Sequence, residues 1–400
     1  MGKNGSEIKA LVLFVLWGLV HKAALGGIKY GLRILNGMKV IKPIWLTTQD
    51  LKIENGHVIL IGRNFHLYAK RSSRRIFYEL LLILTILKSI NIIRRENIQI
   101  VISPGTGWIN DITSLILSIV YNRKIYTFFH HWPYKGYNIW EILYSLREEN
   151  RNLLGLFFAL MERILSKKAL LRSKIVFTVS EKSKDELKSI GVPCERIVVA
   201  YPGVDEEFFK SSICREEYAD IPVFDVITVT RISPEKGIYD LIKIGKILVK
   251  ERKDIKIGVI GHPTSILDKW LALIKKSGLE SNIRYLGIVE RSIQIALLKK
   301  AKVFIFPSYK EGFGIAMAEA MACGLPVVCY DISPLNKIFN SGGVIFIREG
   351  DYESFARKVM ELLDDEKKRN RLGAINRSFS KRFSWTRSSY IIEKHILQSL

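Results

Sequence analysis

The feature of this chain that most constrains its fold is a regular alternation of short apolar runs with longer helical stretches. In the second half, Val226–Thr230, Ile255–Ile260 and Val303–Phe306 have the length and the β-branched composition of buried strands. Helical stretches such as Ile238–Lys250 and Ser292–Lys300 separate these runs. Such alternation predicts the α/β class, in which parallel sheets are covered by helices on both faces.

The alternation continues through the rest of the chain and predicts two doubly wound domains of about six strands each. The segment from Pro202 to Pro222 is richer in polar residues and turns, so we place the domain boundary there. Residues Leu51–Ile61 predict a β-hairpin that turns at Asn55-Gly56. The other expected strands are Leu11–Trp17, Ile44–Thr48, Ile98–Ser103, Ile125–Phe129, Ile175–Val179, Ile197–Ala200, Ile283–Leu286, Val327–Tyr330 and Val344–Ile347. The other expected helices are Ile109–Tyr121, Leu153–Leu171, Lys182–Ile190, Ser265–Lys276 and Tyr352–Leu363.

The chain is strongly basic, with a formal net charge of +23 at pH 7 over 400 residues. Residues 1–200 contain 30 Lys and Arg against 14 Asp and Glu, whereas residues 201–400 contain 32 against 25. A basic half attracts anionic partners such as phospholipid headgroups, nucleic acid or phosphorylated substrates. The basic residues are not interleaved with aromatic stacking platforms, so nucleic acid is not the expected partner.

One apolar stretch, Ile76–Ile93, has arginines at both of its ends. Arg74 and Arg75 precede it, and Arg94 and Arg95 follow it. Polar residues interrupt the stretch, so it lacks the uninterrupted apolar length of a membrane-spanning helix. It fits either a core helix of an α/β domain or a helix that lies on an anionic membrane surface.

The expected location is the cytoplasm, with peripheral association at the inner face of the membrane as a further hypothesis. The four cysteines show neither metal-type pairing nor the density of a disulfide scaffold, which favours reduced thiols. The apolar run Ala10–Val20 resembles the hydrophobic region of a signal peptide, but no convincing cleavage site follows it. A buried first strand explains this run better.

A candidate site lies in the segment Pro307–Pro326, directly after the expected strand that ends at Phe306. The pattern predicts a glycine-containing loop and then a helix of small residues that Gly324 ends. A strand, a glycine loop and an open helix N-terminus form an anion-binding site. Glu319 is the only charge on this apolar helix. Because burial of an unpartnered carboxylate is costly, Glu319 either pairs with a basic side chain or faces a cleft in which a ligand donates hydrogen bonds.

A second candidate segment, Thr228–Gly237, begins at the end of the first strand expected in the second domain. Open α/β sheets bind ligands at this edge. Arg231 and Lys236 bracket a Ser-Pro turn there, and they can converge on one anion. The arginine offers a planar fork and the lysine a point charge to phosphate oxygens. The alternative is a pair of solvated loop charges.

Together these segments resemble family 4 glycosyltransferases. Glu311 to Glu319 resembles the E-x7-E signature of that family, and Arg231 with Lys236 resembles its donor-phosphate pair. The similarity covers Lys174–Arg387 well and the preceding residues loosely. Further matching segments, in the family's order, are Val179-Ser180-Glu181, Gly191-Val192-Pro193, Pro202-Gly203-Val204-Asp205 (with proline where the family has asparagine) and Phe383-Ser384-Trp385.

The resemblance implies the GT-B fold, in which two Rossmann-like domains face each other across a cleft. Residues 1–205 would form the acceptor-side domain, residues 206–382 the nucleotide-sugar donor domain, and residues 383–400 a C-terminal helix that packs back on the first domain. The implied reaction is a retaining transfer of a hexosyl group from a nucleotide-diphosphate sugar to a sugar, glycan or lipid-linked acceptor.

The resemblance also implies roles for individual residues. Arg231, Lys236 and the helix N-terminus at Gly314 would stabilise the leaving diphosphate. Glu319 would accept hydrogen bonds from the ribose hydroxyls, and Glu311 would orient the donor sugar. The implied donor-binding residues are Arg231, Lys236, Gly312, Phe313, Gly314, Ile315 and Glu319, and the implied catalytic residues are Glu311, His130, Arg231 and Lys236.

Two elements of the first half resemble the acceptor side of the same family. Gly26-Gly27 opens the expected helix Ile28–Leu35 and resembles the family's first glycine turn, near the phosphates and the acceptor. His130 and His131 follow the expected strand Ile125–Phe129, where the family often has a histidine close to the donor sugar. We favour His130 for that role. A packed or surface histidine pair is the alternative.

The sequence has no Asp-x-Asp motif, the acidic motif that holds a metal on the diphosphate in GT-A transferases. Asp351-Tyr352-Glu353 shows only a similar spacing and fits a helix N-cap. We therefore expect no metal and no cofactor, with Arg231 and Lys236 neutralising the diphosphate. Two other readings remain open: a GT-B phosphorylase or nucleotide-sugar epimerase, and a basic nucleic-acid- or membrane-binding protein without catalysis.

Overall fold

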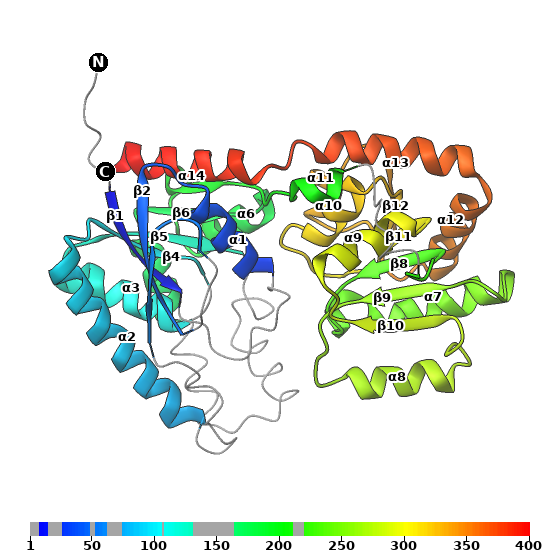
Figure 1. Cartoon of the computed structure of the whole chain (residues 1–400), viewed down its shortest axis with the longest axis horizontal. Helices are drawn as coiled ribbons and strands as arrows, with labels where there is room; N and C mark the ends of the chain where they lie inside the picture. The colour runs from blue at the N-terminus through cyan, green and yellow to red at the C-terminus, as the bar shows by residue number, and fades with distance from the viewer. Residues whose placement is uncertain are drawn as a thin grey trace. The chain divides into compact units, whose positions relative to one another are not determined.

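The computed structural model describes residues 8–14, 26–48, 53–61, 74–105, 108–130, 164–210 and 220–400. The chain divides into two compact units, one formed by Met1–Tyr201 with Trp385–Leu400 and the other by Pro202–Ser384. Each unit is built on a parallel sheet with helices packed against it (Figure 1). The α/β class expected from the alternating pattern is confirmed.

In the described part of the first unit, seven strands form a sheet in the order β3-β2-β1-β4-β5-β6-β7. All neighbouring strands are parallel, and Ile8 of β1 lies opposite Ile41 of β2. The strand order reverses between β1 and β4, as in a doubly wound sheet. The strands are β1 (Ile8–Phe14), β2 (Ile41–Thr47), β3 (His57–Leu60), β4 (Ile100–Ser103), β5 (Lys124–Phe129), β6 (Ile175–Thr178) and β7 (Ile197–Val199).

The helices of the first unit pack against this sheet through aliphatic side chains. Leu81 and Ile93, together with Leu117, form one buried cluster with Leu11 and Val101 of the sheet. The described helices are α1 (Gly26–Asn36), α2 (Arg74–Glu96), α3 (Trp108–Val120), the helix 164–172, α6 (Glu181–Ser189) and α14 (Trp385–Ser399). Residues 15–17 of the expected first strand and 153–163 of an expected helix lie outside the described residues.

The last helix of the chain, α14, is tied to the first unit through a carboxylate. Glu393 accepts hydrogen bonds from the backbone N–H groups of Lys39, Val40 and Ile41, at 3.1, 2.7 and 2.9 Å. These three N–H groups lie where the chain enters β2. The nearly buried carboxylate therefore satisfies backbone donors that would otherwise be costly to bury.

The hairpin expected over Leu51–Ile61 is wrong. Its second half is β3, which pairs in parallel with β2. Asn55 does not reverse the chain; its side-chain amide donates to the carbonyl oxygen of Met38 at 2.8 Å and its own carbonyl accepts from the Trp45 indole at 3.0 Å. At Gly56 (φ 88°) an added Cβ would lie 1.9 Å from the Pro43 oxygen. The Asn-Gly pair thus lets the loop pass close to β2. In sequence, this role of an Asn-Gly pair looks the same as that of a hairpin turn.

The second unit contains a six-stranded parallel sheet in the order β10-β9-β8-β11-β12-β13, within its described residues. This order is again that of a doubly wound sheet, with the reversal between β8 and β11. The last three strands have the expected bounds because each is a short, fully apolar run. The strands are β8 (Val226–Val229), β9 (Ile257–Ile260), β10 (Ile283–Gly287), β11 (Val303–Phe306), β12 (Val327–Tyr330) and β13 (Val344–Ile347).

Among the helices of the second unit, α10 has the bounds that the small-residue pattern predicts and is almost completely buried. The sequence pattern missed α11 and α13. Asn376 of α13 donates to the carbonyl oxygens of Leu325 and Gly343, at 2.9 and 2.8 Å, so this helix closes the region behind α10. The helices are α7 (Ile238–Glu251), α8 (Leu267–Lys276), α9 (Arg291–Lys300), α10 (Ile315–Ala322), α11 (Leu335–Ile338), α12 (Tyr352–Asp364) and α13 (Glu366–Ser380).

Among the helices that the structure describes, none combines the length and the apolar character needed to cross a bilayer. The stretch Ile76–Ile93 lies within α2, whose inner face contributes to the core of the first unit.

Candidate active site

The two candidate segments of the second unit meet at the C-terminal edge of its sheet. β8 and β11 are hydrogen-bonded neighbours at the point where the strand order reverses, so the loops that follow them leave the sheet side by side. The loops touch closely, because a Cβ added to Gly237 would lie 1.8 Å from the oxygen of Pro307. The Tyr309 N–H donates to the carbonyl oxygen of Glu235 at 3.0 Å. The sheet topology therefore builds one surface from both segments.

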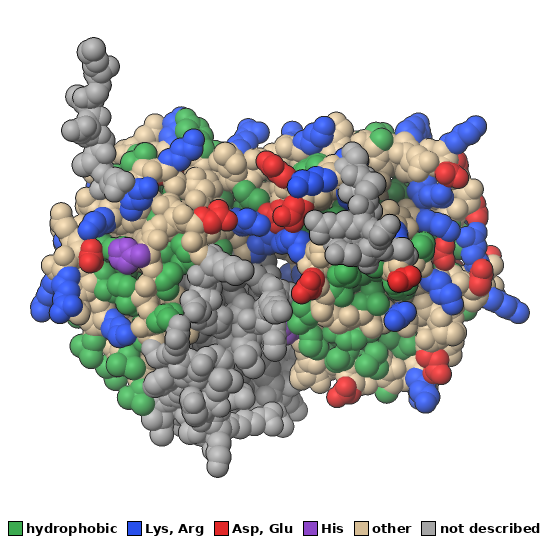
Figure 2. All heavy atoms as spheres, in the orientation of Figure 1, with side chains coloured by type: hydrophobic (Ala, Val, Ile, Leu, Met, Phe, Trp, Pro, Cys, Tyr) green, Lys and Arg blue, Asp and Glu red, His purple; other side chains and the backbone are tan. Residues whose placement is uncertain are grey.

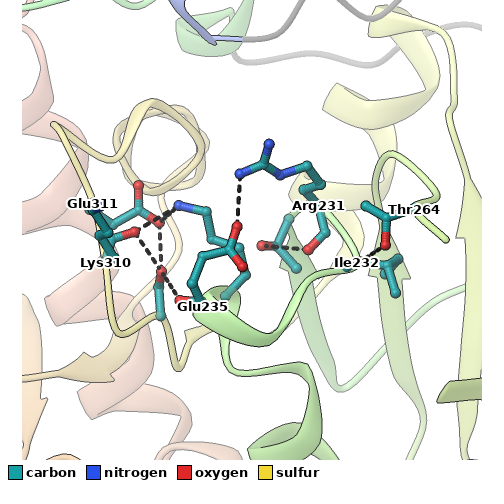
Figure 3. Close-up of polar contacts among 9 residues, drawn as sticks. Arg231, Ile232, Glu235, Thr264, Lys310 and Glu311 are labelled. Carbon is teal, nitrogen blue, oxygen red and sulfur yellow. Dashed lines mark hydrogen bonds and ion pairs between the residues drawn. The ribbon is translucent and has the colours of Figure 1, made fainter. Parts of the chain in front are cut away.

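Lys236 joins the two loops through its ammonium group. Its Nζ lies 2.7 Å from Oε1 of Glu311 and donates to the carbonyl oxygen of Lys310 at 2.8 Å (Figure 3). The same oxygen of Glu311 accepts from the hydroxyl of Ser308 at 2.8 Å. The side chains of Lys236 and Glu311 are only 17% and 10% exposed. Their charges are thus partly desolvated and held in one geometry.

Arg231 lies at the same edge and has a carboxylate partner of its own. Its Nη2 lies 2.9 Å from Oε1 of Glu235, and Figure 3 shows this pair beside Glu311. Partial burial would raise the pKa of Glu235, but the polar groups of Ser233 and the nearby backbone, with the positive charges of Arg231 and Lys236, lower it below its ordinary value. Glu235 is therefore a carboxylate that holds the guanidinium in place, a partner that the sequence analysis did not identify.

The loop 307–314 leads directly into α10. Gly314 is its N-cap residue, so the first N–H groups of the helix point toward this edge of the sheet. Phe313, expected among the donor-binding residues, has its ring buried against Phe339 and Phe383, with centroids 5.3 and 5.2 Å away. Its side chain anchors the loop, and only its backbone remains for a ligand.

Glu319, in the second turn of α10, has the basic partner that was one of the two alternatives. Its side chain is almost buried, and its Oε1 lies 3.6 Å from Nη1 of Arg291. Its Oε2 accepts from the side-chain amide of Gln294 at 3.0 Å. Arg291 also lies 2.7 Å from Oδ2 of Asp205. Arg291 and Gln294, both on α9, connect Glu319 to the segment that begins the second unit.

In the first unit, the expected glycine pair and one of the two histidines are brought near each other through Tyr30. Gly26 and Gly27 form the first turn of α1, two residues earlier than the expected start of the helix. Tyr30 of the same helix contacts the ring of His130 edge to face, with centroids 5.2 Å apart. His131 lies outside the described residues, so the choice between the two histidines stays a prediction.

His130 follows β5, and its ring packs edge to face against that of Tyr30. Burial lowers the pKa of its imidazole to about 4, and a hydrogen bond with the backbone of Pro104 opposes this only in part. The imidazole is therefore neutral near pH 7. Its Nε2 is shielded from solvent and has no hydrogen-bond partner among the described residues. The hydroxyl of Ser183 donates to the backbone oxygen of His130 at 3.0 Å, which fixes the strand end.

No group of three or more His, Cys, Asp or Glu side chains that could hold a metal ion is found within the described ranges. Asp351 accepts a hydrogen bond from the Ser354 N–H at 3.0 Å and caps α12. The interpretation of Asp351-Tyr352-Glu353 as a helix cap is thus confirmed.

Two family profiles match this chain. Residues 50–208 match the profile described as glycosyltransferase family 4, and residues 220–379 match the profile described as glycosyl transferases group 1. The chain belongs to glycosyltransferase family 4.

Curated relatives support this assignment over part of their length. The family 4 chain is 28% identical over 227 residues to O-antigen chain mannosyltransferase B of Escherichia coli, which covers 53% of this chain and 58% of that protein. It is 30% identical over 216 residues to the D-inositol 3-phosphate glycosyltransferase of Paenarthrobacter aurescens, which covers 52% of this chain and 53% of that protein. The matched part thus spans about half the length of these relatives.

Solved structures share the fold over nearly the whole chain. Sucrose-phosphate synthase from Thermosynechococcus elongatus has a TM-score of 0.78 at 15% identity, covering 98% of this chain and 99% of that one. HepE from Anabaena, in complex with UDP and glucose, has a TM-score of 0.72 at 16% identity, covering 98% of this chain and 100% of that one. The expected GT-B fold, with two Rossmann-like domains, is confirmed.

In this family 4 glycosyltransferase, sequence reasoning located the loops of the candidate site but not the side chains that support them. Glu235 is four residues from Arg231 and Ser308 is three residues from Glu311. These short spacings are the local signal that could have identified both partners. Arg291 and Gln294 are more than twenty residues from Glu319 along the chain, and only the packing of α9 against α10 brings them together.

Proposed function

We propose that this family 4 chain is a retaining glycosyltransferase. It transfers a hexosyl group from a nucleotide-diphosphate sugar to a sugar, glycan or lipid-linked acceptor. The observation that carries the proposal is the arrangement of Arg231 and Lys236 beside Glu311 where the strand order reverses in the second unit, directly before the N-terminus of α10. The structure of HepE, which has the same fold, was solved with UDP and glucose bound.

In the proposed reaction, the bond between the anomeric carbon and the diphosphate oxygen breaks and its electron pair stays on the diphosphate. The acceptor oxygen bonds to the same carbon on the same face, and the acceptor proton passes to the diphosphate or to solvent. Arg231, Lys236 and the N-terminus of α10 stabilise the charge that develops on the leaving group. Glu311 orients the donor sugar and Glu319 accepts from the ribose. For His130 we keep the catalytic role that the family resemblance implies.

The two cations supply the positive charge that a metal ion would otherwise bring to a diphosphate. Lys236 is already partly desolvated, so its attraction for a phosphate oxygen is stronger than that of a solvated lysine. We therefore propose metal-independent transfer without a cofactor. A transfer assay in excess EDTA checks this: unchanged turnover is expected, and a loss of activity that Mg²⁺ or Mn²⁺ restores contradicts it.

The test of the function is a screen with UDP-, GDP- and ADP-sugars for transfer, nucleotide release and a rise in melting temperature. We expect one donor class to respond, and Arg231→Ala to lower turnover at least about tenfold, which corresponds to about 1.4 kcal/mol. Free sugar phosphate points instead to a phosphorylase, and an epimerised donor formed without acceptor points to an epimerase. No response to any nucleotide sugar, with salt-sensitive binding of nucleic acid, indicates a binding protein.

We further propose that the chain binds the inner face of a membrane through α2. Leu80, Ile83 and Leu87 are 49%, 52% and 58% exposed and lie on one face of this helix. On its buried face, the hydroxyls of Thr85 and Ser89 donate to the carbonyl oxygens one turn earlier. The inner face of α2 still contributes Leu81 and Ile93 to the core, but it also buries two polar side chains while three large apolar ones face outward.

The charge around α2 favours an anionic lipid surface as its partner. Figure 2 shows hydrophobic side chains gathered over the position of α2, with basic side chains nearby. Arg94 and Arg95, at the C-terminal end of the same helix, are exposed. Basic residues beside an interfacial helix strengthen its binding to anionic lipid.

Flotation with phosphatidylglycerol vesicles at low salt tests this proposal, with phosphatidylcholine vesicles as the lipid control. Ile83→Glu is expected to abolish flotation, whereas Leu271→Glu, at a partly exposed leucine of α8, leaves it unchanged. Wild-type protein that stays unbound on anionic vesicles overturns the proposal. An equal loss of flotation in both variants also overturns it. So does the finding that the protein is a dimer which Ile83→Glu dissociates, because the exposed face of α2 would then be a protein interface.

A further inference from the structure

A buried carboxylate behind the candidate site holds the loop that carries Glu311. Asp240, on α7, is only 4% exposed and accepts hydrogen bonds at one oxygen, Oδ2, from two phenols. One phenol belongs to Tyr330, at the end of β12, at 2.8 Å. The other belongs to Tyr309, two residues before Glu311. The carboxylate thus joins the loop after β11 to a helix and a strand.

The loop after β11 is held from two sides, and the contact with Asp240 is one of them. On the side of β8, the N–H of Tyr309 donates to the Glu235 oxygen, and the hydroxyl of Ser308 lies 3.3 Å from the same oxygen. On the other side, the phenol of Tyr309 reaches Asp240. The next carbonyl, that of Lys310, accepts the ammonium of Lys236. A shift of Tyr309 would therefore move both groups that hold Lys236.

The protonation states favour this arrangement. Burial and the charge of Asp240 raise the pKa values of both Tyr309 and Tyr330 above the ordinary value, so both phenols remain donors at neutral pH. Lys243 lies 3.6 Å from Oδ1 of Asp240 and donates to the Tyr352 hydroxyl at 2.8 Å. The carboxylate is thus an acceptor supported by a cation, and its two phenol bonds are charge-assisted.

Exposure separates this role from ordinary core packing. Tyr309 is 38% exposed, whereas Tyr330 is fully buried. Burial of the Tyr309 ring therefore contributes less to folding, and its hydroxyl is the group that ties the loop to Asp240 of α7. We propose that Asp240 is a positioning residue which, through Tyr309, keeps Glu311 and Lys236 in the geometry required for sugar transfer. This inference rests on the proposed function.

The test uses Tyr309→Phe, which removes only the hydroxyl, with Tyr352→Phe as the matched control at a phenol that contacts Lys243 but not the loop. We expect Tyr309→Phe to lower kcat about tenfold, because a small displacement of Glu311 and Lys236 would strongly slow the transfer of the sugar. The KM for the donor and the affinity for the free nucleoside diphosphate should change less than about twofold, and the melting temperature by less than about 2 °C. Asp240→Asn should retain part of the kcat that Asp240→Ala loses, since an amide oxygen still accepts one phenol.

Hydrogen–deuterium exchange over residues 307–314 gives a second measurement that does not depend on turnover. Faster exchange in Tyr309→Phe than in Tyr352→Phe is expected. Normal kcat with unchanged exchange in Tyr309→Phe overturns the positioning role while the enzyme function stands. If the wild type transfers no sugar, the proposed function fails, and unchanged exchange still overturns the role of Asp240 in holding the loop.

Discussion

Two ion pairs join the same two strands of the second unit at opposite ends of the sheet. At the C-terminal ends of β8 and β11, Lys236 lies 2.7 Å from Glu311. At the N-terminal ends of these strands, Lys302 lies 2.8 Å from Asp225. The distances are nearly equal, but the lysine side chain is 17% exposed in the first pair and 42% exposed in the second.

The surroundings of the two pairs explain what each can do. Asp225 also accepts a hydrogen bond from the N–H of Lys256 at 3.0 Å. The pair of Asp225 and Lys302 therefore ties together the starts of β8, β9 and β11. The pair of Lys236 and Glu311 joins two loops that leave the sheet side by side at the reversal of strand order, where doubly wound sheets bind their ligands. The position of an ion pair on the sheet, rather than its length, therefore indicates whether it serves binding or folding.

The largest expected difference is in turnover. Lys236→Ala removes a partly desolvated cation from the proposed diphosphate site and should lower kcat/KM about tenfold to a hundredfold, since a charge-assisted hydrogen bond contributes about 1.5–3 kcal/mol. Lys302→Ala removes the matched cation at the other end of the strands and should change kcat/KM less than about twofold. Steady-state kinetics with the responding nucleotide sugar measures both. Equal losses in the two variants would remove the distinction between the two ends.

A second comparison is between Glu319 of α10 and Gln294, which donates a hydrogen bond to it. Glu319→Gln keeps the shape but removes the charge facing Arg291, and should lower turnover about tenfold or more. Gln294→Ala removes one hydrogen-bond donor from the same carboxylate and should have a smaller effect. If Glu319→Gln keeps normal kinetics but loses thermal stability, the carboxylate serves only its pairing with Arg291.

A pH titration of stability tests the environment of His130 in the first unit. His130 follows the C-terminal end of β5. Burial lowers the folded-state pKa of His130 to about 4, against about 6.5 in the unfolded chain. The unfolded chain therefore binds this proton first as the pH falls. The free energy of unfolding should fall through the window from about pH 6.5 to about pH 4.

Denaturant unfolding across that window is the measurement. His130→Gln should flatten this part of the stability profile relative to the wild type. Parallel profiles for the wild type and His130→Gln would mean that His130 binds its proton equally in the folded and unfolded states.

The smallest expected effect concerns the ion pair of Lys302 and Asp225. Burial alone would raise the pKa of Asp225, but hydrogen bonds from Lys302 and the Lys256 N–H, with the nearby positive charges, hold it below its ordinary value. The stabilisation it gives is present above the unfolded-state pKa of about 3.9 and is lost as the pH falls through the lower folded-state value. Asp225→Asn should therefore be less stable than the wild type by only about 0.5–1 kcal/mol near neutral pH, because the Lys302 side chain is 42% exposed and solvent weakens the pair. The difference should shrink in acid, and a constant difference at every pH would rule out this electrostatic origin.

Much of the fold was predictable because a strand buried on both faces must be a short apolar run. Val303–Phe306 and Val327–Tyr330 have the expected bounds for this reason. The small-residue helix Ile315–Ala322 was equally clear, since Gly314 and Gly324 mark its two ends. The Asn55-Gly56 pair was misleading, because a glycine that crosses a strand closely and a glycine that turns a hairpin look alike in sequence.

By itself, the sequence determined that the chain is a doubly wound α/β protein of family 4, and that its candidate site lies on the segments around Arg231, Lys236, Glu311 and Glu319. These properties depend on local residue patterns and short motifs. The tertiary structure decided which distant side chains support these residues. Lys236 meets Glu311 because two loops leave adjacent strands at one edge, and Arg291 and Asp240 reach Glu319 and Tyr309 because separate helices pack behind that edge. Contacts between residues far apart in the chain follow from sheet topology and packing, which leave no local pattern in the sequence.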